Sequence, residues 1–160
     1  MNSALLQGKS LHRRYVTMLA PLLAMFCLRV IGQLIVAIFH VPYLPPMEQW
    51  YSGLIPYPIL LPCQMAIIGF YGKVCLDLVR GEGYFARLHP RLGQALRIFG
   101  PVYLAAMIIR YIVRMALYPQ QRWTGGSIPI FFHWVLAAFL IVLGSFYEVM
   151  QTQSRRNVHP

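Results

Sequence analysis

Four long runs of apolar residues divide the chain, at about residues 16–39, 57–76, 98–117 and 128–147. Each run has roughly the 20 residues that an α-helix needs to cross about 30 Å of hydrocarbon. Strands are not expected, because an isolated strand would leave its backbone polar groups unpaired in lipid. The pattern therefore predicts an all-α integral membrane protein, in which residues 1–160 form one domain of four transmembrane helices arranged as two hairpins.

The composition agrees with this interpretation and excludes a nucleic-acid partner. Of the 160 residues, 58% are hydrophobic and 11% are charged, whereas a soluble domain usually has about a quarter charged residues. The net charge is +10, but the basic residues cluster between the apolar runs and do not form one continuous face, as a nucleic-acid interface would require. Membrane lipids are the expected partners.

The distribution of basic residues predicts the orientation of the chain. They occur in the N-terminal segment, around the middle loop (residues 77–97) and in the C-terminal tail: Lys9, Arg13, Arg14, Lys73, Arg80, Arg87, Arg91, Arg97, Arg155 and Arg156. The other two connections contain Arg122 as their single basic residue. By the positive-inside rule, both termini and the middle loop are cytoplasmic, and a bacterial inner membrane is expected. The first run contains Arg29 and is too long for a cleaved signal, so it is predicted to be a retained span.

A short motif occurs twice, as WYSGLIPYP from Trp50 and as WTGGSIPIF from Trp123. Both copies stand just before an apolar run, in connections predicted to lie outside. Either the motif recurs by chance in a chain of this composition, or the two hairpins form a parallel internal repeat with a pseudo-two-fold axis along the membrane normal. The residues expected to form the rim of an outer vestibule are Glu48, Trp50, Gly53, Pro56, Trp123, Gly126 and Pro129.

Polar residues inside the apolar runs mark a candidate binding site. They lie at a similar depth in the outer half of the predicted bundle: Arg29, Gln33, Gln64, Arg110, Arg114 and His133. An arginine near the bilayer centre costs about 2.5–3.5 kcal/mol on the insertion scale. Glu48, in the first outer connection, is the single acidic residue predicted to lie close enough to pair with these arginines. The arginines therefore either reach the lipid headgroups or hold an anionic or carbonyl-bearing ligand.

Three functions fit these residues. The leading hypothesis is a binding or accessory subunit for an amphipathic anion or a quinone-like molecule, with Tyr57, Phe131, Phe132 and Trp134 as aromatic walls. The alternative is a redox protein in which His40 and His133 are the axial ligands of haem b. The third is a structural membrane subunit without a ligand. No set of residues typical of hydrolytic catalysis is recognised, so an enzyme is not the favoured interpretation.

The remaining features are interpreted as structural. Cys27, Cys63 and Cys75 lie in apolar runs without metal-ligand spacing, so neither a metal site nor a disulfide is predicted. The middle loop is expected to contact anionic headgroups, and His89-Pro90 to begin a short helix before the third span. Small residues that would allow close helix approach are Gly69, Gly72, Ala105, Ala106, Ala137, Ala138 and Gly144. A homo-oligomer or a larger membrane complex is compatible with so small a bundle.

Overall fold

The computed structural model describes residues 2–39, 43–50, 56–119 and 127–158, and within these ranges it contains helices and no strand. The elements are α1 (Asn2–Phe39), a short 3-10 helix η1 (Met47–Gln49), α2 (Tyr57–Arg80), α3 (Pro90–Leu117) and α4 (Ser127–Val158). All four α-helices are long and apolar enough to cross a membrane. The predicted all-α integral membrane fold is therefore confirmed, and each expected span lies within one of these helices.

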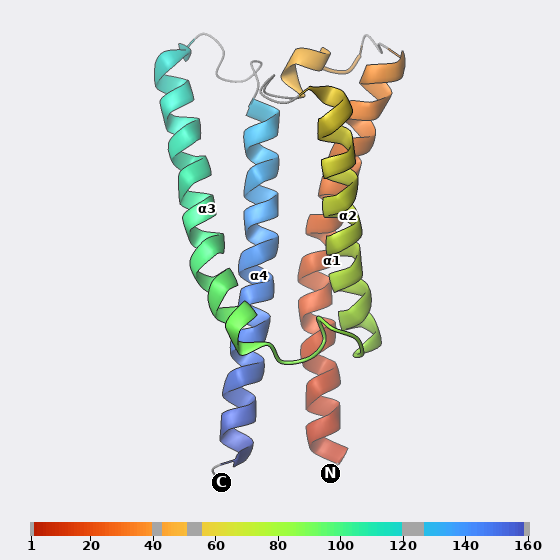
Figure 1. Cartoon of the computed structure of the whole chain (residues 1–160), viewed down its shortest axis with the longest axis vertical. Helices are drawn as coiled ribbons and strands as arrows, with labels where there is room; N and C mark the ends of the chain where they lie inside the picture. The colour runs from red at the N-terminus through yellow and green to blue at the C-terminus, as the bar shows by residue number, and fades with distance from the viewer. Residues whose placement is uncertain (1, 40–42, 51–55, 120–126, 159–160) are drawn as a thin grey trace.

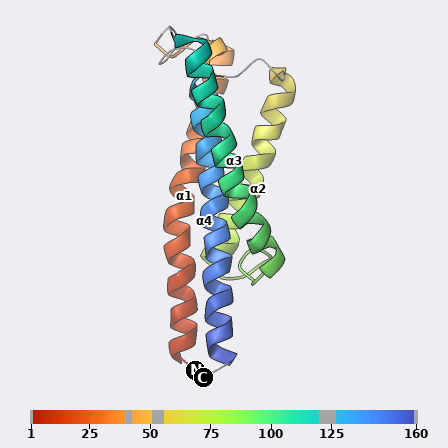
Figure 2. The same cartoon turned by 90° about the vertical axis from the view of Figure 1, so that its left-hand side faces the viewer.

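Close backbone contacts connect the four helices in the order α2, α1, α4, α3, which we call the row, and α1 and α4 are its central members. Helix α2 packs on α1, α3 packs on α4, and α1 contacts α4 (Figure 1). Both termini lie at one end, where α1 and α4 extend beyond the connection between α2 and α3 (Figure 2). We call this end the basic end, and the opposite end, which holds η1, the Trp50 end.

The core is built from α1, α2 and α4. Its buried apolar side chains include Leu19, Phe26, Val74, Leu78, Phe139, Leu143 and Phe146. The ring of Tyr71 on α2 stacks on Phe139 of α4 with 3.7 Å between centroids, and its hydroxyl donates to the Leu136 carbonyl at 3.3 Å. Side chains thus connect α2 to α4, and α3 is the least buried of the four helices.

Glycines bring the backbones of α3 and α4 close together. A Cβ added to Gly93 would lie 2.7 Å from Cβ of Tyr147, and one added to Gly100 would lie 2.8 Å from Cγ1 of Ile141. A Cβ on Gly144 would lie 3.3 Å from the backbone of α3. Helices in lipid gain no hydrophobic force from association, so this close van der Waals packing is a main source of attraction between α3 and α4.

Four of the small residues expected at helix contacts do not lie at one. A Cβ added to Gly69 or Gly72 would meet nothing within 4 Å among the described residues, so the prediction is wrong for both. Ala105 and Ala106 are exposed on α3. A small residue permits two helices to approach closely, but close packing also requires a second helix that faces that residue.

Proline begins two of the helices. Pro58 lies in the first turn of α2 and Pro90 in that of α3, where the missing N–H would be unpaired in any case. Helix α3 continues without a break from Pro90 to Leu117. The separate short helix expected at His89-Pro90 is therefore the first part of α3.

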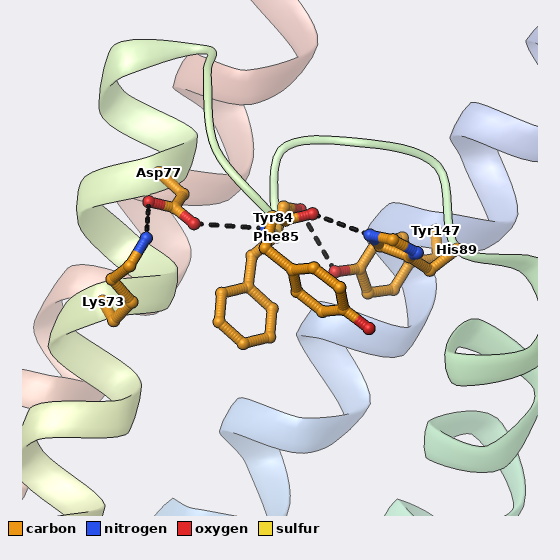
Figure 3. A network of polar contacts seen from close by, with 6 residues as sticks. All are labelled: Lys73, Asp77, Tyr84, Phe85, His89 and Tyr147. Carbon is orange, nitrogen blue, oxygen red and sulfur yellow. Dashed lines mark hydrogen bonds and ion pairs between the residues drawn. The ribbon is translucent and has the colours of Figure 1, made fainter.

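The connection between α2 and α3 (residues 81–89) folds around the Asp77 carboxylate (Figure 3). Asp77 is 4% exposed. Its Oδ1 accepts a hydrogen bond from Lys73 Nζ, and its Oδ2 accepts the Phe85 N–H at 3.2 Å. Its backbone carbonyl accepts the Glu82 N–H at 3.2 Å. One buried side chain at the end of α2 therefore sets the course of the connection.

Two glycines with positive φ give the connection its shape. Gly81 ends α2 in the left-handed conformation with φ 67°, a common helix stop. Gly83 has φ 102° and lies against Asp77, because a Cβ there would be 2.6 Å from the carboxyl carbon. Beyond them, the Tyr84 and His89 rings stack with 4.2 Å between centroids.

The same connection is attached to both central helices. Tyr147 on α4 donates its hydroxyl hydrogen bond to the Phe85 carbonyl at 3.1 Å (Figure 3). On α1, His12 Nε2 lies 3.3 Å from the Ala86 carbonyl. Phe85 and Ala86 are buried. Residues 81–89 therefore join α1, α2 and α4 at the basic end.

We expect Gly83→Ala to lower the free energy of unfolding by about 1–3 kcal/mol, the usual cost of a strained backbone position, because the new Cβ also meets the Asp77 carboxylate. The matched control is Gly72→Ala, a helical position with open space around it, where the unfolding temperature should stay equal or rise. Thermal unfolding of the detergent-solubilised protein measures both. An unchanged unfolding temperature for Gly83→Ala would contradict this account of the connection.

Candidate functional site

Arg29 on α1 is the most buried cation among the described residues, with 7% of its surface exposed. Its Nη2 donates to the Trp50 backbone carbonyl at 2.6 Å. Its guanidinium carbon lies 5.7 Å from the centroid of the Phe132 ring on α4, within cation–π range. Arg29 Nε is buried and has no hydrogen-bond partner among the described residues. The charge is therefore partly compensated, by a carbonyl and a ring.

Trp50 lies inside the bundle and positions that carbonyl. The residue follows η1, is buried, and donates its indole N–H to the Pro45 carbonyl at 2.8 Å. Its ring lies on Gly32 of α1, where an added Cβ would be 2.8 Å from the ring. Because Gly32 has no side chain, the Trp50 ring can pack directly on α1. The Trp50 carbonyl then reaches Arg29, which is also on α1.

Gln33 and Gln64 form a second polar contact, between α1 and α2. Gln64 Nε2 donates to Gln33 Oε1 at 3.0 Å. Gln33 is 0% exposed and Gln64 is 3% exposed. The Gln33 amide nitrogen and the Gln64 amide oxygen are buried and have no partner within the described part of the chain. The pair therefore holds α1 to α2 and keeps one donor and one acceptor free.

Arg110 and His133 lie on the other pair of helices and are near each other. The Tyr103 hydroxyl on α3 shares a hydrogen bond with His133 Nδ1 on α4. This contact places His133 where α4 packs against α3. Arg110 is half-buried. Tyr103 has no special signal in the sequence, since it is one tyrosine among ten.

These polar groups lie in the halves of their helices that are nearer the Trp50 end. At 1.5 Å per residue, Arg29 lies about 15 Å and Gln33 about 9 Å from the end of α1. By the same measure, Gln64, Arg110 and His133 lie about 9–11 Å from the nearer ends of their helices. Each of the four helices therefore carries a polar group within about 15 Å of its end toward the Trp50 end, and we call these groups together the polar layer.

The other predicted site residues have mixed placements. Arg114 is half-buried on α3, Pro56 is exposed just before α2, and Pro129 is buried in the first turn of α4. Five further sites lie outside the described residues or side chains: His40, Glu48, Gly53, Trp123 and Gly126. The structure therefore describes neither the Trp and Gly of the second motif copy nor His40, one of the two expected haem ligands. Among the described residues, no three His, Cys, Asp or Glu side chains are grouped to hold a metal ion.

No protein-family model, curated protein sequence or solved structure was found to match the chain. The function of the polar layer must therefore be inferred from its geometry and chemistry. That layer offers two guanidinium groups, an imidazole and two amides. Groups of this kind bind anionic or carbonyl oxygens.

A double-mutant cycle on Gln33→Leu and Gln64→Leu tests the contact between α1 and α2. Each single variant leaves its partner's amide buried and unpaired, so we expect a loss of about 1–3 kcal/mol of folding free energy. The double variant should lose less than the sum, with a coupling of about 0.6–1.7 kcal/mol. Reversible unfolding in mixed micelles gives the three values. Strictly additive losses would contradict the contact.

Proposed function

We propose that this protein is a membrane-embedded binding or accessory subunit. Its polar layer holds the head of an amphipathic anionic or quinone-like molecule. Arg29 and Arg110 bind the oxygens of the ligand, and Gln33, Gln64 and His133 complete the set. The observation that carries the proposal is the buried Arg29 guanidinium, which keeps an N–H without a partner among the described residues.

The scarcity of carboxylates supports this interpretation. The whole chain has four acidic residues. Asp77 pairs with Lys73 and Glu148 with Arg97, both toward the basic end. Glu82 follows α2 at the same end. One acidic residue, Glu48, belongs to the Trp50 end, and one carboxylate is not enough to neutralise both Arg29 and Arg110.

The surroundings of Arg29 suit a ligand that is polar at one end. The Phe132 ring contacts its guanidinium, and the Tyr57 hydroxyl and the Trp134 indole N–H are further buried polar atoms with no described partner. Aromatic rings of this kind would pack against the flat or apolar part of the ligand.

The proposed orientation follows the positive-inside rule, with both termini in the cytoplasm of a bacterium and the Trp50 end outside. In that orientation, the ligand enters from the outer leaflet of the inner membrane. The second copy of the Trp motif would then stand on the same side, as an internal repeat requires.

Arg29→Gln and Arg110→Gln should each remove the bound molecule from the purified protein. The reason is that each variant deletes a cation from the polar layer but keeps a polar side chain of similar reach. Native mass spectrometry of the protein, extracted in mild detergent, measures the bound mass. The matched control is Arg91→Gln, which removes an exposed charge at the opposite end of α3 and should leave the bound mass unchanged.

The variant Glu48→Gln distinguishes two ways of neutralising the arginines, by a bound ligand or by a carboxylate of the chain itself. If an external ligand neutralises the arginines, Glu48→Gln keeps the bound mass and lowers stability little. If Glu48→Gln destabilises the protein as strongly as Arg29→Gln does, the chain supplies the counter-ion and the proposal fails. Unchanged bound mass in both arginine variants would also overturn it.

A further inference from the structure

A groove lies at the basic end, between the first turns of α1 and the last turns of α2, far from the polar layer. It has a volume of about 780 Å³. Its lining includes three cations, Lys9, Arg13 and Arg80, and three apolar residues, Val16, Leu78 and Val79. We call it the α1–α2 groove.

The cations of this groove outnumber its carboxylates and form no ion pair within the described residues. Lys9, Arg13 and Arg80 form no ion pair there, because the two recorded ion pairs join Lys73 to Asp77 and Arg97 to Glu148. Of the two remaining acids, Glu48 belongs to the Trp50 end and Glu82 lines the groove. One carboxylate against three cations leaves a net positive charge in the groove. An anion from outside the chain can neutralise that charge.

The groove is polar at one side and apolar at the other. Val79 is 65% exposed and lies beside Arg80 in the sequence. Val16 marks the start of the first apolar run on α1, three residues after Arg13. On α1, Lys9 and Arg13 therefore come just before the first apolar run, and on α2, Leu78 and Val79 come just before Arg80 at the end of the helix. A phospholipid has the same order, with an anionic phosphate followed by acyl chains.

The end of the groove is fixed before any ligand binds. His12, which lines it, contacts the Ala86 carbonyl. Gly81, which also lines it, is the left-handed end of α2. The connection that carries these contacts is held by the Asp77 carboxylate. A site held in its binding shape loses little conformational freedom on binding, which favours affinity.

We propose that the α1–α2 groove is a binding site for the headgroup of an anionic phospholipid. Lys9, Arg13 and Arg80 bind the phosphate oxygens, and an acyl chain lies along Val16 and Val79. A free phosphate ion would use the cations and leave the apolar residues without a role. The site is independent of the polar layer at the Trp50 end, so either proposal stands if the other fails.

The test is a lipid titration of the purified full-length protein in detergent, followed by native mass spectrometry. The probes are phosphatidylglycerol and the zwitterionic phosphatidylcholine. We expect phosphatidylglycerol to bind more tightly, and Arg13→Gln/Arg80→Gln to weaken its binding roughly 30-fold, since each basic residue near a membrane surface contributes about fivefold. Lys9→Gln should weaken it about fivefold.

The matched control is Arg87→Gln/Arg156→Gln, which removes the same charge from exposed positions at the basic end that do not line the groove. It should change phosphatidylglycerol binding by less than about threefold. Equal weakening in the control and in the groove variant would overturn the site. Equal binding of the two lipids would overturn the headgroup assignment. Full displacement of the lipid by inorganic phosphate would show a site for free anions and overturn the assignment to a lipid.

Discussion

The absence of water from the bilayer core is the constraint on which this structure depends. Backbone polar groups must then pair within helices, and helix association cannot rely on the hydrophobic effect. The molecule meets this demand with glycine contacts between α3 and α4, ring stacking between α2 and α4, and a few buried hydrogen bonds. The hydrogen bond between Gln33 and Gln64 is one of these. Polar groups left without partners are consequently rare, and they are informative where they occur.

The fold could be predicted because length and composition alone identify a membrane-spanning helix. The four apolar runs correspond to α1, α2, α3 and α4. Helix ends were predicted less well, since apolar runs mark only the part of a helix that lies in hydrocarbon. Helices α1 and α4 continue through polar residues to Asn2 and Val158. The row arrangement was not predicted, because no sequence pattern states which apolar face meets which.

The candidate site was predicted in part. Arg29, Gln33 and Gln64 are recognisable because polar residues are expensive in a transmembrane segment, and the structure buries all three. The sequence did not indicate the groups that surround these three residues, because those groups are defined by contacts between distant parts of the chain. Tyr103 and Gly32 gain their roles only from residues far along the chain that pack on them. In the sequence, Asp77 cannot be distinguished from an ordinary acidic residue of a loop. Its role is apparent only in the structure, where the backbone of residues 81–89 folds around its carboxylate.

The position of α4 in the row has a consequence for the order of assembly. A chain is synthesised from its N-terminus, so α4 enters the membrane last, although it contacts both α1 and α3. Until then, α1 and α2 form a hairpin whose buried core is incomplete. The contacts of Gln33 with Gln64 and of Arg29 with Trp50 lie entirely within this hairpin. Each of these three side chains thus has one hydrogen bond before α4 is synthesised, whereas the contact of Arg29 with the Phe132 ring must wait for α4.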